Sequence, residues 1–198
     1  MTTLRMPWLH VGDGWRTGSV TLFPVWAEGP TVSGLSVAAD GVEVAEREAA
    51  PVVAELVLRN TSTRPVLLFE GELLEGGWQH RVLNTDVLLA AGQAHVAAVS
   101  CVEQGRWKGS TRHGRRARLA SGTVRLGLRD PSPGRQGEVW RRVSRFEPVL
   151  GPTETFSLAE HLDRVAAGRD AAGRPVGRSH AHHLPEHPLS GGATVRLR

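Results

Sequence analysis

The chain has 198 residues, of which 40% are hydrophobic, and a formal net charge of +4. This length suffices for one hydrophobic core without disulfides or metal. Its single cysteine, Cys101, excludes an intramolecular disulfide framework and a cysteine-rich zinc site. No apolar run approaches the roughly 20 residues that span a bilayer, and the N-terminus has no signal-peptide core, so we expect a cytoplasmic protein with no membrane partner.

Charge is divided unevenly along the chain. Residues 1–104 carry 6 Lys and Arg against 12 Asp and Glu, whereas residues 105–198 carry 18 against 8, so the two parts should attract each other. Lys108 is the only lysine, and all other basic residues are arginine. Arginine excess is typical of phosphate or nucleic-acid contact. The codon bias of a GC-rich genome also explains it, and we favour that explanation.

Short apolar runs separated by Gly, Pro, Asn and Asp dominate residues 17–102, a pattern typical of strands rather than helices. Asp40-Gly41 fits a two-residue hairpin turn between the runs 35–37 and 42–44. Ala91-Gly92 marks a later turn. This alternation of strand and turn predicts a mainly β fold, an antiparallel sandwich or a barrel-like core.

The composition changes after Trp107. Residues 105–122 are basic and lack a core periodicity, which predicts an exposed loop, and residues 123–130 fit one more strand. The tail is rich in Gly, Pro, His and Arg, which predicts a loose C-terminal segment over residues 169–198. We expect a single domain over residues 1–190.

One or two short helices are predicted in the C-terminal part. Val139 and Val143 recur at helical spacing and are followed by Pro148, where a helix should stop. The run Ser157–Gly168 begins with a capping serine and ends with a glycine, as helices commonly do.

Polar side chains cluster between Phe69 and Trp107, in an otherwise apolar stretch. They belong to neighbouring strand-like runs joined at Gly76-Gly77, so we expect their polar groups to converge. Glu70 and Glu72 are two positions apart, so on one strand they share a face about 7 Å apart. Such a pair suits acid–base chemistry or a cation. The polar residues of this constellation are Glu70, Glu72, Gln79, Arg81, Asn84, Glu103, Gln104 and Arg106.

A purely structural alternative stays open for the same residues. In it, Arg81 forms an ion network with the glutamates of the constellation, and Asn84 caps a turn. Cys101 also has two interpretations. In an apolar strand it is an inert core residue, which we favour, whereas as a nucleophile it needs His80 or His95 to approach it in space.

A resemblance to a known family rests on four runs. They are FEGELLEGGWQHRVLN, DVLLAAGQ, SCVEQGRW and GEVW. These runs are similar to the ADP-ribosylglycohydrolase-and-rhodanese-phosphatase-superfamily-associated protein domain, a bacterial family, and the similarity covers most of residues 20–190. The family name implies an ADP-ribose, nucleotide or NAD-derived context. The positions that the resemblance places on the family motif are Glu70-Gly71-Glu72, Gln79, Arg81, Asn84, Cys101-Val102-Glu103 and Gly105-Arg106-Trp107.

Two features depart from the family pattern. His80 stands where the resemblance implies a small polar residue such as Asn or Asp. Similar proteins also continue past the position of Arg198 into a further strand and helix, so we expect this chain to be truncated relative to the family.

Together these observations predict a domain that binds or processes a small anionic or nucleotide-like ligand in an ADP-ribose or nucleotide context. Whether it is an enzyme, and its oligomeric state, are left open. One alternative is a non-catalytic regulatory or protein-interaction module, and a second, less favoured one is nucleic-acid binding through the basic C-terminal half. The candidate catalytic residues are Glu70, Glu72 and Glu103. The candidate ligand-binding residues are Gln79, Arg81, Asn84, Gln104, Arg106 and Trp107.

Two further clusters have weaker interpretations. A basic stretch near Trp107 fits a phosphate-backbone footprint, but a solvated loop is favoured. Histidines in the tail fit adventitious binding of zinc or nickel, and we assign neither a metal site nor a cofactor. The P-loop, GxSxG, HExxH and Rossmann fingerprints are absent. The basic residues are Lys108, Arg112, Arg115, Arg116 and Arg118, and the histidines are His180, His182, His183 and His187.

Overall fold

The computed structural model describes residues 8–27, 34–38, 40–48, 51–130 and 133–173. The chain divides into two compact units, one formed by residues 1–34 with 182–198 and the other by residues 35–181. The single domain expected over residues 1–190 stays a prediction, because the compactness of each unit says nothing of how the two sit together. The loose tail expected from residue 169 lies, from 174 onward, outside the described residues.

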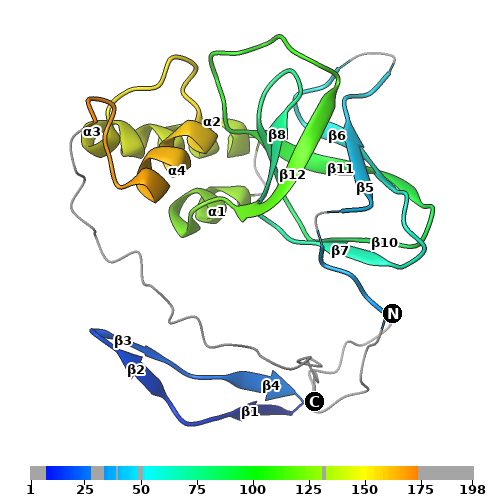
Figure 1. The fold of residues 1–198 in the computed structure, drawn as a ribbon, viewed down its shortest axis with the longest axis vertical. Coiled ribbons are helices and arrows are strands. Elements are labelled where there is room, and N and C mark those ends of the chain that lie inside the picture. Colours follow the sequence, from blue (N-terminus) through cyan, green and yellow to red (C-terminus); the bar gives the residue numbers. More distant parts are fainter. Residues whose placement is uncertain (1–7, 28–33, 39, 49–50, 131–132, 174–198) are drawn as a thin grey trace. The chain divides into compact units, whose positions relative to one another are not determined.

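The first unit contains a hairpin of four short strands (Figure 1). The two inner strands pair with each other, and so do the two outer strands, all antiparallel. Gly18 makes the turn at the tip with φ +59°, a conformation that glycine adopts without strain. The strands are β1 (Leu9–Val11), β2 (Trp15–Thr17), β3 (Val20–Leu22) and β4 (Val25–Ala27).

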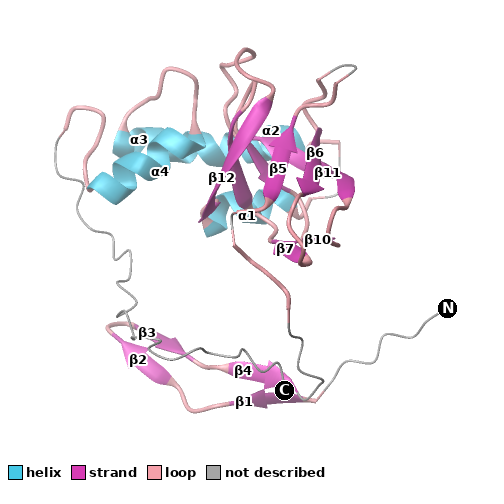
Figure 2. Ribbon diagram, turned by 45° about the vertical axis from the view of Figure 1, so that its right-hand side comes forward, coloured by secondary structure: helices cyan, strands magenta, loops and turns pink. Residues whose placement is uncertain are grey.

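The second unit is built on a closed barrel of six antiparallel strands, which confirms the mainly β prediction in its barrel form (Figures 1 and 2). Around the barrel the order is β11-β6-β5-β12-β8-β9. A separate pair, β7 with β10, is also antiparallel. The bounds are β5 (Val42–Ala45), β6 (Glu55–Asn60), β7 (Val66–Leu68), β8 (Glu72–Gly76), β9 (Arg81–Leu83), β10 (Val87–Leu89), β11 (Ala94–Cys101) and β12 (Arg112–Leu119).

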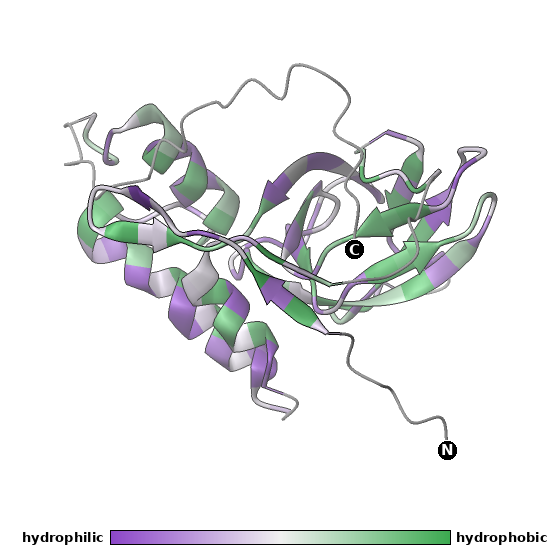
Figure 3. Cartoon of the chain, turned by 90° about the horizontal axis from the view of Figure 1, so that it is seen from below, coloured by the Kyte–Doolittle hydropathy of each residue, from purple (hydrophilic) through white to green (hydrophobic). Residues whose placement is uncertain are grey.

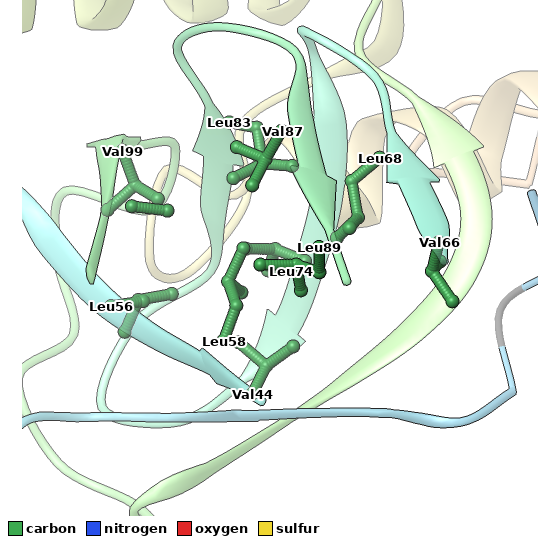
Figure 4. Packing of buried hydrophobic residues seen from close by; sticks show 11 residues of the cluster. Val44, Leu56, Leu58, Val66, Leu68, Leu74, Leu83, Val87, Leu89 and Val99 are labelled. Carbon is green, nitrogen blue, oxygen red and sulfur yellow. The ribbon is translucent and has the colours of Figure 1, made fainter. Parts of the chain in front are cut away.

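Apolar side chains at alternate positions along the strands fill the inside of the barrel. In β6, Leu56, Leu58 and Asn60 are buried while Arg59 is exposed, because successive side chains point to opposite faces. Figure 4 shows the buried side chains of this core pointing toward one another inside the ring of strands. Its members are Val44, Leu56, Leu58, Val66, Leu68, Leu74, Leu83, Val87, Leu89, Ala97 and Val99.

Helices cover one side of the barrel and share a second core with it (Figures 1 and 2). Leu73 and Val82 lie on the outer face of their strands and pack in this core. The helices carry hydrophobic and hydrophilic segments side by side (Figure 3), as expected for a layer with one buried face. None of the described helices is long and apolar enough to cross a membrane. The bounds are α1 (Gly122–Leu128), α2 (Arg135–Val143), the 3₁₀ turn Ser144–Phe146, α3 (Glu147–Leu150) and α4 (Leu158–Ala167).

The two predicted helices are present with the expected signals. In α4, the Ser157 hydroxyl accepts a hydrogen bond from the Glu160 N–H, and Gly168 ends the helix in the left-handed conformation. Helix α2 ends at Val143, but the chain continues as a 3₁₀ turn and as α3, where Pro148 occupies the first turn rather than ending a helix.

Strand β12 corrects the exposed loop predicted over residues 105–122. It pairs with β5 and β8 and so closes the barrel. This strand was not recognised in the sequence because its inward-facing residues are polar. His113 is paired with Glu46, and Arg115 is paired with Glu72. Without apolar residues at alternate positions, a strand cannot be recognised from periodicity.

Two smaller predictions are also wrong. Residues 123–130 form helix α1 rather than a strand. Val124 and Leu128 are buried four positions apart, a spacing that fits both the period of about 3.6 residues in a helix and the two-residue period of a strand. Asp40-Gly41 does form a turn, but not within a hairpin, because Ser36 bridges Val66 in parallel instead of pairing with β5.

Candidate anion-binding site at one end of the barrel

The central residue of the candidate site is Arg81, on β9. Its cross-strand partners are Leu74 on β8 and Cys101 on β11. Paired residues project to the same face of a sheet, and Leu74 belongs to the barrel core, so Arg81 projects into the barrel. Its exposed fraction is 0%, and it is the largest fully buried side chain of the described residues.

The guanidinium of Arg81 is poorly satisfied. Its Nε donates a hydrogen bond of 3.0 Å to the Val53 carbonyl. Neither Nη1 nor Nη2 has a hydrogen-bond partner among the described residues. Burial lowers the pKa of Arg81, and the Cys101 thiol and the Glu46 carboxylate act in the opposite direction. Most buried charges are paired and hydrogen-bonded, so this arrangement requires an explanation.

Two tryptophans lie at this end of the barrel. The guanidinium carbon of Arg81 is 5.7 Å from the ring centroid of Trp107, within the range of a cation–π contact. Trp78 meets Trp107 edge to face, with the ring centroids 5.1 Å apart. Trp107 is 45% exposed, so the fully buried guanidinium of Arg81 has a solvent-accessible aromatic neighbour.

Arg106, predicted to hold the ligand, holds Glu103 instead. Its Nε and Nη2 donate to the two carboxylate oxygens of Glu103 at 2.9 and 2.6 Å. Its remaining contacts are to backbone carbonyls of Gly77, Lys108 and Gly76, at 2.7, 2.8 and 3.2 Å. The side chain therefore fixes the loop after β11 to the β8–β9 turn, and its donors are used within the protein.

Glu103 is fully engaged as well. It accepts hydrogen bonds from the His80 N–H at 2.9 Å and the Thr155 hydroxyl at 2.8 Å, besides the two from Arg106. Burial by itself raises the pKa of Glu103, but these donors outweigh it, so the pKa is lowered and the carboxylate stays ionised. A general base with a lowered pKa and filled oxygens is poorly suited to take a proton.

The two other candidate carboxylates, Glu70 and Glu72, form ion pairs with arginines of the C-terminal part. Glu70 accepts hydrogen bonds of 3.1 and 2.7 Å from Arg125. Glu72, buried, accepts one of 2.6 Å from Arg115. Neither forms a hydrogen bond or an ion pair with Arg81 in the described part of the chain, so the expected convergence of all three glutamates on Arg81 is not found there. Their catalytic roles stay predictions.

The amide side chains of the constellation differ in their environments. Gln79 is buried and donates to the Glu103 carbonyl at 3.0 Å, while its Oε1 has no partner among described residues. Asn84 accepts a hydrogen bond of 2.8 Å from the Ser100 hydroxyl. Gln104 is exposed. Among these three amide side chains, Gln79 is the one with a buried polar atom that has no partner in the described structure.

Cys101 is buried, as expected from its apolar run. The side chain of Gln136 on α2 forms two hydrogen bonds with the backbone of Cys101. It accepts one from the Cys101 N–H and donates one to the Cys101 carbonyl, both at 2.8 Å. Burial raises the pKa of the thiol. The thiol is thus protonated at neutral pH, which supports the inert interpretation.

Sequence reasoning missed a buried pair beside Arg81. Glu46, just after β5, lies 3.1 Å from Nε2 of His113 on β12, and both side chains have an exposed fraction of 0%. The two residues are 67 positions apart, so no local motif connects them. The signal available in the sequence was a histidine inside an arginine-rich stretch, which we interpreted as a loop.

A cleft of about 760 Å³ borders this end of the barrel on its outer face. Glu46 and Trp78 line it together with residues of β5 and β6, such as Arg59. The described residues contain no group of three or more His, Cys, Asp or Glu side chains placed to hold a metal ion. The histidines of the tail lie outside the described residues.

Comparison with known proteins identifies the family and nothing closer. No curated protein and no solved structure shows significant similarity to the chain. The signature of one family, the ARG and Rhodanese-Phosphatase-superfamily-associated Protein domain, matches residues 8–177. The match spans most of the chain, including the barrel, Arg81 and the helices. The chain therefore belongs to the ARG and Rhodanese-Phosphatase-superfamily-associated Protein domain family.

Proposed function

We propose that this domain binds a small anion inside one end of its barrel, namely the phosphate or pyrophosphate group of a nucleotide-derived molecule such as ADP-ribose. The observation that supports the proposal is the guanidinium of Arg81, which is fully buried and whose two Nη groups have no partner among described residues. The family context points to the same class of ligand.

The energetics favour an anionic partner for Arg81. An uncompensated buried charge costs several kcal/mol, and Glu46 and Glu103 act on Arg81 only at a distance, without an ion pair in the described structure. The planar fork of arginine binds phosphate and carboxylate oxygens through two parallel hydrogen bonds. An anion at Nη1 and Nη2 offsets the desolvation cost that the free protein carries.

The groups around Arg81 suit a ligand that carries more than a phosphate. Gln79 Oε1 and Glu46 Oε2 are buried acceptors without a described partner, and ribose hydroxyls are donors that match them. Trp78 and Trp107 offer aromatic rings on which a base can stack. These features support a nucleotide-like ligand rather than orthophosphate alone.

The basic C-terminal half gives less support to nucleic-acid binding. Several of its arginines are paired with glutamates of the acidic half, as the charge distribution suggested. The pairs are Arg125 with Glu70, Arg115 with Glu72, Arg118 with Glu75 and Arg112 with Glu43. Charge used in this way is not available to a phosphate backbone.

A thermal-shift titration tests the proposal. ADP-ribose at about 100 times its Kd should raise the Tm by about 5 to 10 °C, because a ligand that binds only the folded state stabilises it. In Arg81→Met the free protein should be as stable as the wild type or more so, since an apolar side chain replaces a buried charge, and the response should disappear. Arg141→Met, a change of an exposed arginine on α2, should keep the full response. An unchanged wild-type Tm, or an Arg81→Met variant that responds like the wild type, contradicts the proposal.

A further inference from the structure

The buried pair of Glu46 and His113 can hold a variable number of protons. His113 Nδ1 lies 3.3 Å from the Leu74 carbonyl oxygen, and Nε2 lies 3.1 Å from Glu46 Oε1. The same carboxylate oxygen accepts a hydrogen bond of 3.3 Å from the Trp78 N–H. The pair therefore connects β5, β8 and β12 at the same end of the barrel as Arg81.

Both ring nitrogens of His113 face oxygen acceptors. The carbonyl oxygen and the carboxylate oxygen both accept, so a neutral imidazole, with a single N–H, can donate to only one of them. Both contacts become hydrogen bonds only when the ring carries a second proton. With that proton the pair is neutral, and without it the pair carries one negative charge. Glu46 Oε2 is buried without a described partner, so the pair also has an unused oxygen.

The charged groups around this pair come from three elements. Arg81 on β9 interacts electrostatically with both Glu46 and His113. His80, in the β8–β9 turn, interacts with His113 and with the Glu103–Arg106 pair. Burial lowers the pKa values of His80 and His113. In the free protein, the positive charge of Arg81 therefore opposes protonation of the Glu46–His113 pair.

We propose that the Glu46–His113 pair takes up a proton when a dianion binds at Arg81, so that anion binding at this site is coupled to protonation. This inference rests on the proposed function. A dianion more than neutralises Arg81, which removes the repulsion of the proton and adds attraction in a low-dielectric interior. By linkage, the anion then binds more tightly as the pH falls, by about tenfold per pH unit for each whole proton taken up.

Calorimetric titration with sulfate measures the coupling. Sulfate remains a dianion near neutral pH, so any proton exchange belongs to the protein. Titrations at the same pH in two buffers of different ionisation enthalpy give the number of protons taken up. The wild type should take up about 0.5 to 1 proton per sulfate. In Glu46→Gln, the uptake should fall close to zero while sulfate still binds.

Two matched variants locate the proton. Glu43→Gln removes an exposed carboxylate on β5, three positions before Glu46, and should leave the uptake unchanged. His80→Asn replaces the neighbouring histidine and should also leave it unchanged. Loss of the uptake in His80→Asn, but not in Glu46→Gln, overturns the inference by assigning the proton to His80.

The wild-type titration alone also decides between the two proposals, which matters if Glu46→Gln does not fold. Sulfate binding without proton uptake overturns the coupling and leaves the proposed function standing. Absence of sulfate binding to the wild type overturns the coupling, while the proposed function is then decided by the ADP-ribose thermal shift. Binding with uptake that is lost in Glu46→Gln supports both.

Discussion

Glu103 and Arg106 form a two-pronged ion pair in which both carboxylate oxygens receive a hydrogen bond from the guanidinium, at 2.9 and 2.6 Å. The glutamate side chain is 5% exposed and the arginine side chain 18% exposed. These two residues, which the motif places beside a ligand, instead fix the loop that carries Trp107. The loop in turn places Trp107 over Arg81, so the pair shapes the site indirectly.

Removing one partner of this pair should destabilise the protein strongly. Arg106→Ala strands a buried carboxylate and should lower the free energy of unfolding by about 3 to 5 kcal/mol. Arg141→Ala breaks an exposed ion pair with Glu138 on α2 and should have a much smaller effect. Urea denaturation of both variants measures the free energy of unfolding. Equal losses in the two variants would show that the Glu103–Arg106 pair stabilises the protein no more than an exposed ion pair does.

Trp107 should contribute to ligand affinity through its contact with Arg81 and with a stacked base. Trp107→Ala should weaken ADP-ribose binding by about tenfold, in line with 1 to 2 kcal/mol for an aromatic contact of this kind. Trp26→Ala, a change in the hairpin of the first unit, serves as the control and should bind normally. Isothermal titration of both variants is the measurement. An unaltered Kd in Trp107→Ala places the ligand elsewhere.

Cys101 should react slowly with thiol reagents in the native protein. Burial raises the pKa of its thiol, and only the thiolate reacts. Gln136 holds its backbone in place, so Gln136→Ala should accelerate labelling by loosening α2 from β11. The rate of labelling is measured in buffer and in denaturant. Complete labelling of the folded wild type within seconds would reverse the assignment and make Cys101 a reactive residue.

His161 should make the protein less stable in mild acid. It is 0% exposed and stacked on Phe146, and burial followed by repulsion from Arg164 lowers its pKa from 6.5 to about 4. Between pH 6.5 and pH 4 the unfolded state therefore binds the proton more readily than the native state does. The contribution of His161 to the free energy of unfolding is complete above pH 6.5 and is lost as the pH falls toward 4. Between about pH 7.5 and pH 5 the loss should be about 2 kcal/mol.

The variant His161→Leu isolates this contribution, because the half-buried His80 and the buried His113 remain in it. The free energy of unfolding should fall less between the two pH values in His161→Leu than in the wild type. An identical pH dependence in the two proteins would mean that His161 is already protonated or hydrogen-bonded in the native state.

Local signals in the sequence predicted much of the fold. The alternation in β6 and the caps of α4 are properties of short segments, and the structure has both. Strand β12 could not be predicted in this way. Its inward residues, His113 and Arg115, gain their burial from partners on other strands. A pattern based on hydrophobicity cannot show a strand whose inner face is built from ion pairs.

The candidate site was predictable only in part, for a related physical reason. Arg81 was identified, because it belongs to the polar constellation between Phe69 and Trp107 and to the run that carries the family resemblance. Its neighbours were assigned from sequence proximity, which favoured Glu70 and Glu72. Barrel closure instead brings Glu46 to the same end of the barrel as Arg81, within range of an electrostatic interaction. Which side chains meet depends on strand order, and strand order is not encoded in any single run.

The most direct test of the account is a crystal structure of the protein grown with ADP-ribose. The account predicts phosphate oxygens within hydrogen-bond distance, about 2.7 to 3.1 Å, of both Arg81 Nη1 and Nη2, with Trp107 displaced or stacked on the ligand. A structure in which ADP-ribose lies elsewhere, while both Nη groups bind ordered water molecules, would contradict it.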